Sequence, residues 1–293
     1  MARTLVIGGT GTVGSATVSE LLRRGAEVSV MTRSVEKARA LPAGVNGVVG
    51  SMQRPESLPA VFEGIQKLFL ITPLDRDEMH QGIDAVDAAV AAGVGHIVYL
   101  SVHYADQALE IPHFVSKLPV EGAIKASGVP YTILRPNNFF QNDLGLKDAI
   151  LAGFYPQPMG AIGMHRVDVR DIAEAAAIAL TEPGHAGQTY SVVGPEAFNA
   201  ERTAALFSRL FGRPVVCVGE DLQAWAAQAR AFVPAWMVRD LMIMFDYFQR
   251  QGLLATPAEI DAITRVLGHP PRRYEDFVRK TLAQWGRAVS APV

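Results

Sequence analysis

The sequence predicts an α/β fold, in which a doubly wound parallel sheet carries a smaller, mostly helical lobe toward the C-terminus. Three observations lead to this prediction. Short runs rich in β-branched residues alternate with longer stretches of helical period. A glycine-rich turn joins the first run to the first helical stretch. Beyond residue 194 the pattern is mostly helical.

The strand candidates follow one another at the spacing that crossover helices require. They are residues 4–7, 27–31, 47–49, 67–71, 96–100 and 131–134. These runs are nearly continuous in apolar residues, as expected for parallel strands that helices cover on both faces. Between the fourth and fifth runs, apolar residues recur at helical spacing, at Met79, Ile83, Val86 and Val90.

The rhythm changes after Pro136, and this change predicts the division into domains. Residues 1–136 form the dinucleotide-binding part, and the chain returns to the sheet at about 165–194 with a helix at 169–180 and a strand at 189–193. Residues 137–164, rich in glycine and proline, and residues 195–293 form the lobe on the substrate side.

The composition allows a large core and excludes several classes of protein. Hydrophobic residues make up 49% of the 293 residues and charged residues 19%, which excludes disordered, collagen-like and coiled-coil chains. The formal net charge is −2 with no basic stripe, so we expect no nucleic acid among the partners. Cys217 is the only cysteine, and no paired-histidine spacing occurs, so we expect neither an internal disulfide nor a metal site.

The sequence also gives no indication of a membrane. No segment approaches the roughly 18 uncharged apolar residues that a spanning helix needs. The N-terminal apolar run stops at Gly8 and Gly9, too early for a secretory signal. We therefore expect a cytoplasmic protein with no membrane partner.

The glycine-rich turn has the pattern of a site for a dinucleotide. Its glycines stand at Gly8, Gly11 and Gly14, directly after the first strand and at the opening of a helix. Glycine allows the sharp turn, the close approach of a pyrophosphate and tight helix–sheet packing, and the helix N-terminus favours the phosphate charge. The loop predicts a Rossmann-type domain, with cofactor contacts from Gly8, Thr10, Gly11, Thr12, Val13 and Gly14.

The end of the second strand indicates which dinucleotide binds. A site for NAD usually has an acidic residue here, and this sequence has Thr32, Arg33 and Ser34 instead. A guanidinium and two hydroxyls suit a ribose 2′-phosphate. We therefore expect NADP(H) as the cofactor.

Five motifs spread over the chain carry a resemblance to a known family. They are GGTGTVG at 8–14, TRS at 32–34, LRPNNFFQN at 134–142, VDVRDIAEAA at 167–176 and LGHPPRRYEDFV at 267–278. Together they resemble the NmrA-like family of atypical short-chain dehydrogenases, and most of all its bacterial NADPH-dependent quinone, azo-dye and triphenylmethane-dye reductases. The family also includes regulators that bind the dinucleotide without turning it over.

The resemblance implies further cofactor contacts. The segment at Thr72 and Pro73 is expected along the nicotinamide half. Family members usually carry Gly-Asp after the third strand, with the carboxylate on the adenine, whereas this chain has Gly50 and Ser51. Ser51 retains a hydroxyl that can bond the adenine amino group.

The resemblance also points to the catalytic residues. Short-chain dehydrogenases place a tyrosine four residues before a lysine, and the matching segment here has His113 and Lys117. Lys117 is expected to hold the ribose hydroxyls and polarise a substrate oxygen. A spacing of four puts both side chains on one helical face, so His113 is a candidate proton relay or simply a structural histidine. Ser101, after the fifth strand, is either an oxyanion donor or a turn-capping serine.

Residues after the fifth and sixth strands are expected to face the substrate, because ligands of open α/β sheets lie beyond the carboxyl ends of the strands. They are His103, Tyr104, Asn138, Phe139 and Phe140. Aromatic and methionine residues also crowd the segment 225–248, which would fit a wall for flat ligands, the surface of a homodimer or a plain helical core.

These observations leave two hypotheses for function. The first is an NADPH-dependent reductase that transfers hydride to a small conjugated substrate such as a quinone, an azo or triarylmethane dye, or an enone-like compound. Such electrophiles accept hydride without an elaborate acid–base apparatus, which fits the absent tyrosine. The second is a non-catalytic NADP(H)-binding sensor that acts through a protein partner.

Overall fold

The structure is a computed structural model that describes residues 2–290, with side chains described to residue 286. The chain divides into two compact units. Unit 1 comprises Met1–Pro136, Val169–Val192 and Ala262–Gly268, and unit 2 comprises Asn137–Asp168, Val193–Asp261 and His269–Val293. The sequence assigned all of 195–293 to the second lobe, so the placement of 262–268 in unit 1 departs from that expectation.

Unit 1 is built on a parallel sheet of seven strands in the order β3-β2-β1-β4-β5-β6-β8. The strands are β1 (Arg3–Ile7), β2 (Glu27–Thr32), β3 (Val45–Val49), β4 (Lys67–Leu70), β5 (His96–Leu100), β6 (Tyr131–Pro136) and β8 (Gln188–Val192). The sequence order reverses between β1 and β4, which is the switch point of a Rossmann-type sheet. The predicted fold class is therefore confirmed.

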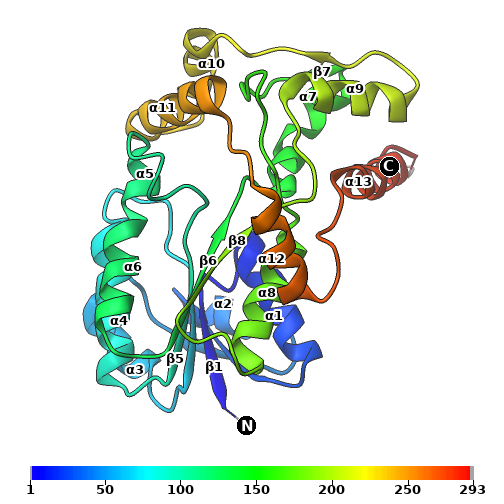
Figure 1. The fold of residues 1–293 in the computed structure, drawn as a ribbon. Coiled ribbons are helices and arrows are strands. Elements are labelled where there is room, and N and C mark those ends of the chain that lie inside the picture. Colours follow the sequence, from blue (N-terminus) through cyan, green and yellow to red (C-terminus); the bar gives the residue numbers. More distant parts are fainter. Residues whose placement is uncertain (1, 291–293) are drawn as a thin grey trace. The chain divides into compact units, whose positions relative to one another are not determined.

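Helices cover both faces of this sheet. They are α1 (Thr12–Arg23), α2 (Val35–Arg39), η1 (Pro55–Ser57), α3 (Leu58–Val61), α4 (Glu78–Ala91), α5 (Pro112–Val115), α6 (Lys117–Ala126) and α8 (Val169–Thr181). Figure 1 shows α1 and α8 on one side of the sheet and α3, α4 and α6 on the other. Each face is thereby removed from water.

Alternation along the strands supplies the two halves of the core. Leu5 and Ile7 of β1 pack into the cluster on the α3, α4 and α6 side, together with Leu68 and Leu70 of β4. Val6 lies between them in β1, is fully buried and points to the opposite face because successive strand side chains alternate. Both faces of these strands are therefore core, which explains the unbroken apolar runs in the sequence.

Unit 2 is mostly helical and has a sheet of two short strands. It contains η2 (Phe140–Leu146), α7 (Lys147–Leu151), β7 (Phe154–Tyr155), α9 (Ala200–Phe211), β9 (Val216–Cys217), α10 (Leu222–Ala229), α11 (Ala235–Gln251) and α13 (Tyr274–Ser290). Helix α12 (Pro257–Leu267) begins in a segment of unit 2 and ends in one of unit 1. Over the described residues, no helix is both long enough and apolar enough to cross a bilayer.

Candidate active site

The glycine loop joins β1 to α1, and two of its glycines are required by the fold itself. A Cβ at Gly14 would lie 2.1 Å from the carbonyl oxygen of Gly8, a distance that no side chain can occupy. Gly8 has a φ of +80°, in the left-handed region that favours glycine. These two positions need glycine whether or not a ligand binds.

Gly11 has a different reason to be glycine. Its φ of −82° suits any residue, and a Cβ built there would meet only the Gly8 carbonyl oxygen, at 3.4 Å. Gly11 is exposed and is the N-cap of α1, with no side chain capping the helix. The N-terminus of α1 thus begins at an exposed residue without a side-chain cap, which is the environment that a pyrophosphate needs. The loop fits the phosphates of a dinucleotide.

The other predicted loop residues divide by exposure. Thr10 and Thr12 are exposed, so their side chains are accessible to a ligand. Val13 is 5% exposed and packs into the core. A contact from Val13 to a cofactor is therefore restricted to its backbone.

The end of β2 presents one unpaired cation. The Thr32 hydroxyl donates to the carbonyl oxygen of Ser34 at 3.1 Å, and the Ser34 Oγ accepts from the Lys37 N–H as the N-cap of α2. Both hydroxyl oxygens are thus engaged locally. The Arg33 guanidinium is exposed and has no hydrogen bond or ion pair with any residue that the structure describes. Arg33 is the residue at this edge with donors left for a 2′-phosphate.

After β3, Ser51 lies in a tight local turn. Its Oγ accepts from the Gln53 N–H at 3.2 Å, and the Gln53 amide reaches the Asp75 carboxylate at 3.2 Å. Asp75 lies in the loop after β4. A carboxylate is therefore present at this edge, although Ser51 stands where the resemblance implies an aspartate.

Gln81, one turn into α4, carries the single buried side-chain oxygen without a partner among the described residues. No motif in the sequence points to Gln81.

A buried polar cluster holds Lys117 next to Thr72. The Lys117 ammonium bonds Glu78 Oε1 at 2.5 Å and Thr72 Oγ1 at 3.2 Å. Glu78, at the start of α4, also accepts from Thr72 at 2.6 Å and from Ser116 at 2.9 Å. The Glu78 side chain is 2% exposed and that of Lys117 is 15% exposed. An ammonium has three donors, so one N–H of Lys117 has no partner among the described residues.

Tyr99 of β5 lies beside this lysine. The Lys117 ammonium lies 6.0 Å from the centre of its ring, and its hydroxyl is 3.3 Å from Thr72 Oγ1. Burial raises the pKa of the Tyr99 phenol well above its usual range, and the Glu78 carboxylate adds to this. Tyr99 therefore remains protonated.

The segment around His113 differs from the sequence prediction. His113 lies in α5 and Lys117 is the first residue of α6, because regular helical hydrogen bonding breaks at Ser116. The single helix expected over both residues is therefore divided into two at Ser116. The His113 ring packs edge-on against Phe114 with centroids 4.9 Å apart.

Ser101 belongs to a second polar network, beneath the loop after β5. Its hydroxyl donates to Glu121 Oε1 at 2.6 Å, and Arg135 binds both oxygens of Glu121 at 2.9 and 2.8 Å. Burial alone would raise the pKa of the Glu121 carboxyl, but the bonds from Arg135 and Ser101 outweigh it and hold that pKa below its usual range. The Ser101 proton is thus directed at Glu121, which does not fit an oxyanion donor, the first of the two roles expected for this residue.

His103 and Tyr104 follow in the same loop. His103 is 2% exposed, its backbone N–H donates to the Pro136 carbonyl oxygen at 2.9 Å, and its ring lies 4.5 Å from that of Tyr104. Tyr104 has a φ of +64°, the only positive φ of a non-glycine residue among those described. Such a backbone is costly and concentrates at functional loops. The sequence analysis predicts that His103 and Tyr104 face the substrate, but it does not predict the positive φ of Tyr104.

In unit 2, the three residues predicted to face the substrate have three different environments. Phe140 is 1% exposed and packs on the rings of Tyr274 and Phe277, so its assignment to a substrate wall was wrong. Phe139 is half-buried, and its carbonyl oxygen accepts from Arg166. Asn138 is half-buried and also contacts Arg166.

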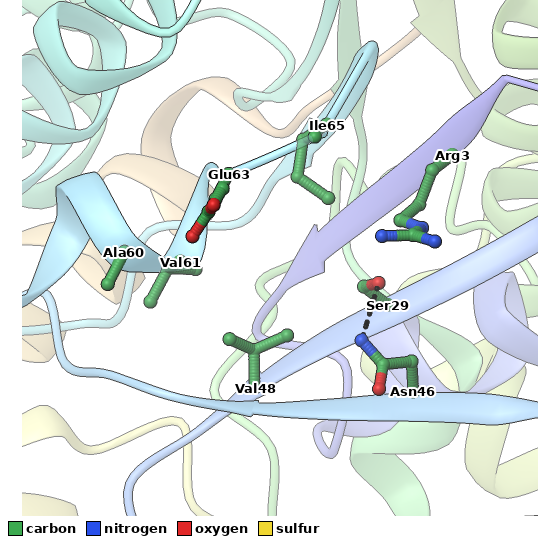
Figure 2. Close-up of a pocket in the computed structure, with 9 residues that line it drawn as sticks. Arg3, Ser29, Asn46, Val48, Ala60, Val61, Glu63 and Ile65 are labelled. Atoms are coloured by element: carbon green, nitrogen blue, oxygen red, sulfur yellow. Dashed lines mark hydrogen bonds between the residues drawn. The ribbon is translucent and has the colours of Figure 1, made fainter.

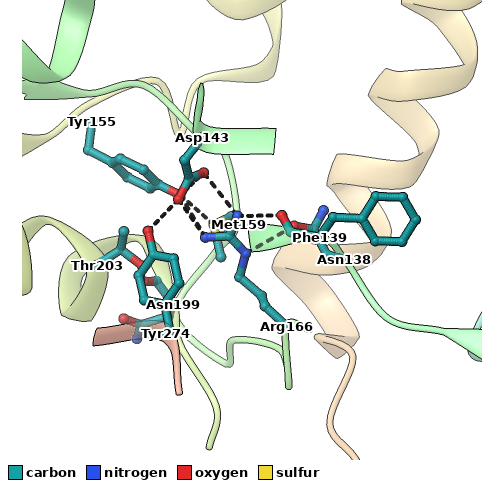
Figure 3. Close-up of polar contacts among 9 residues, drawn as sticks. All are labelled: Asn138, Phe139, Asp143, Tyr155, Met159, Arg166, Asn199, Thr203 and Tyr274. Carbon is teal, nitrogen blue, oxygen red and sulfur yellow. Dashed lines mark hydrogen bonds and ion pairs between the residues drawn. The ribbon is translucent and has the colours of Figure 1, made fainter. Parts of the chain in front are cut away.

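The fully buried Arg166 is the centre of a network that sequence reasoning missed (Figure 3). Its guanidinium forms a two-bond pair with Asp143, each bond 2.9 Å long. Tyr155 and Tyr274 donate to the same carboxylate. Burial raises the pKa of both phenols well above the usual range, so they remain donors.

A hollow in unit 1 lies away from these residues. Figure 2 shows it lined by Arg3 and Ser29, with Asn46 of β3 and residues 60–65 of the chain after it. Its volume is about 420 Å³. Arg3 is the first residue of β1, so the hollow lies toward the amino ends of the strands, opposite to the edge where ligands of such sheets bind. We do not assign it to the active site.

The described residues contain no cluster of histidine, cysteine, aspartate and glutamate that could hold a metal ion. The polar groups at the carboxyl edge of unit 1 instead fit a dinucleotide: the uncapped N-terminus of α1 after Gly11, an unpaired guanidinium at Arg33 and a spare donor on Lys117.

Comparison with known proteins gives a consistent result. The model of the NmrA-like family matches residues 2–269. The NAD(P)H azoreductase of Xenophilus azovorans is 33% identical over 293 residues, which cover 97% of this chain and 99% of that protein. Quinone oxidoreductase 2 of Escherichia coli is 26% identical over 275 residues, covering 90% and 93% of the two chains. The structure of the Citrobacter sp. triphenylmethane reductase complexed with NADP(H) superposes with a TM-score of 0.84 at 26% identity, covering 95% of this chain and 99% of that one.

Proposed function

Because the chain belongs to the NmrA-like family, we propose that it is an NADPH-dependent reductase that transfers hydride to a small conjugated substrate. The observation that carries the proposal is the spare donor of Lys117. A buried glutamate fixes this ammonium beside Thr72, yet one N–H is left for a ligand. The names of the relatives, an azoreductase, a quinone oxidoreductase and a triphenylmethane reductase, support the substrate class.

NADP(H) is the cofactor that the residues fit. The N–H groups around Gly11 would bind the pyrophosphate, and Arg33 would bind the 2′-phosphate. Lys117 would bind the hydroxyls of the nicotinamide ribose. A relative named for NAD(P)H and a structure complexed with NADP(H) support the same choice.

The protein's contribution to the reaction is to bind, orient and shield. When bound, NADPH supplies the hydride. Glu78 fixes the Lys117 ammonium, whose free N–H would bind the ribose hydroxyls and so orient the nicotinamide toward the substrate. A quinone reduced in this way takes up two electrons with the hydride and gains its second proton from solvent. Tyr99 stays protonated, and His113 remains a predicted relay.

The proposal is tested by the loss of NADPH absorbance with a panel of quinones and dyes. We expect NADPH to be consumed with at least one neutral quinone, and NADH to be consumed much more slowly. Tight binding of NADPH without consumption by any acceptor would instead support the sensor hypothesis.

A further inference from the structure

Unit 2 contains a cavity of its own, with a volume of about 180 Å³. One wall is apolar and comes mainly from α11, with Leu241, Met244, Phe245 and Phe248, and Met159 adds a second thioether. Aromatic rings and flexible thioethers pack well against flat ligands. A cavity of about 150 Å³ is known to enclose one benzene molecule. This cavity therefore has room for one ring and not for three.

The remaining wall is polar but offers no unpaired charge. Arg166 and Asp143 line the cavity and neutralise each other. The five donors of Arg166 are all in use, on Asn138, Asp143, Tyr155 and the Phe139 carbonyl oxygen. A cationic dye would find no free anion in this wall, and a phosphate or carboxylate would find no free cation. The lining favours a neutral molecule.

Asn138 supplies a donor whose direction is fixed. Arg166 Nε–H can only donate, and it does so to Asn138 Oδ1 at 3.0 Å, so the amide oxygen must face Arg166. The Nδ2 group is on the other branch of the amide, and its two N–H donors have no partner among the described residues. The side-chain amides of Asn142 and Gln157 also line the cavity without partners in the part of the chain that the structure describes. The polar wall is thus a set of neutral N–H donors suited to a carbonyl oxygen.

We propose that this cavity binds a neutral, one-ring conjugated carbonyl compound, with Asn138 Nδ2 donating to its carbonyl oxygen. Arg166 acts as a positioning residue, because it holds the amide in the orientation that presents N–H rather than C=O. As the substrate of the proposed reductase, the occupant is a quinone of benzoquinone size rather than a three-ring dye cation. Only this last identification rests on the proposed function.

The first experiment measures binding without NADPH, so that no reaction takes place. Acetophenone serves as a neutral one-ring probe, and its Kd is measured by titration calorimetry for wild type and variants. Asn138→Asp keeps an acceptor for Arg166 but presents an oxygen to the cavity, and should weaken binding at least about tenfold. Asn138→Ala, which removes the donor without adding charge, should also weaken binding.

The matched control is Gln228→Glu, the same amide-to-acid change at an exposed position of α10 that does not line the cavity. It should leave the Kd unchanged. Crystal violet, a three-ring cation, should not displace acetophenone, and neither should benzoate. Wild-type affinity in both Asn138 variants, or displacement by crystal violet, would overturn the proposal.

A second experiment separates this proposal from the proposed function. NADPH consumption with p-benzoquinone is measured for wild type and Asn138→Asp, with folding checked by thermal melt. Turnover by wild type with unchanged kcat/KM in Asn138→Asp would reject the cavity as the substrate site and leave the reductase intact. Asn138-dependent binding of acetophenone without NADPH consumption by any acceptor would reject the reductase and leave the binding site.

Discussion

The Arg166–Asp143 pair of unit 2 and the Lys117–Glu78 pair of unit 1 are both buried ion pairs, but they are built differently. In unit 2, Arg166 and Asp143 are 1% and 2% exposed in their side chains, and every donor of the guanidinium has a protein partner. In unit 1, Glu78 is equally buried, but Lys117 is 15% exposed and keeps one donor without a partner among the described residues. A pair that is fully satisfied serves the fold, whereas a pair with a spare donor at a sheet edge is available to a ligand.

The same contrast extends to the surroundings of each pair. Near Lys117, the carboxyl edge of unit 1 also presents the open backbone at Gly11 and the unpaired Arg33. Around Arg166, two tyrosines close the remaining positions on Asp143. We therefore expect substitutions in the first group to change ligand binding and rate. Substitutions of Arg166 and Asp143 should change stability, and any effect of Arg166 on the cavity of unit 2 should act through the orientation of Asn138.

The largest effect is expected for Arg166→Met. Removing the guanidinium leaves Asp143 buried without a counter-charge, which typically costs about 3–5 kcal/mol of unfolding free energy. Urea denaturation of wild type and variant measures the difference. A loss below about 1 kcal/mol would show that the network contributes little to the fold and would weaken the contrast between the pairs.

Two glycine substitutions separate folding from binding within one loop. Gly11→Val should still fold but lose NADPH binding, because the side chain would fill the space expected for the pyrophosphate.

Gly14→Ala should destabilise the fold, because its Cβ would lie 2.1 Å from the Gly8 carbonyl oxygen. Calorimetric titration and thermal melts check both. Retained NADPH affinity in folded Gly11→Val would show that the loop is only a turn.

Arg33→Ala tests the unpaired guanidinium. The variant should lose about 1.5–3 kcal/mol of binding free energy for NADPH and little for NADH, because a hydrogen-bonded charge is removed from the 2′-phosphate alone. Its stability should match wild type, since Arg33 is exposed and has no hydrogen bond or ion pair with any described residue. Equal affinity of wild type for the two cofactors would make the assignment to NADP(H) wrong.

Local features of the sequence were enough to predict the sheet and the loop. Each strand candidate is a short apolar run, and all seven form with ends that shift by at most two residues. The glycines at Gly8 and Gly14 follow from a turn contained within seven residues of sequence. Strand pattern and turn chemistry act over short distances, so a single sequence carries them.

The residues that were misassigned depend on distant partners. Ser101 and its acceptor Glu121 are 20 residues apart in the sequence. Tyr274 and its acceptor Asp143 are 131 residues apart. Phe140 looked like a ligand contact because it follows a strand, but α13 covers it with aromatic rings. No pattern in one sequence encodes such pairings, whereas Lys117 was found because its spacing from His113 resembles a family motif.

The smallest expected change is in the turnover of a Lys117 variant, and it tests the proposed role of this residue most directly. Lys117→Ala should lower the turnover of p-benzoquinone at saturating NADPH at least about tenfold, or ~1.4 kcal/mol of barrier. Because Glu78 would then be buried without its partner, the double variant Glu78→Gln/Lys117→Met restores charge balance and should be folded and equally slow.

The most direct test is therefore the steady-state rate of NADPH oxidation by wild type, Lys117→Ala and the double variant, each shown by thermal melt to be folded. We predict one hydroquinone formed per NADPH consumed in wild type, and at least about a tenfold lower kcat in both variants. A wild-type rate in either folded variant would contradict the account, because the spare donor of Lys117 would then have no part in the reaction.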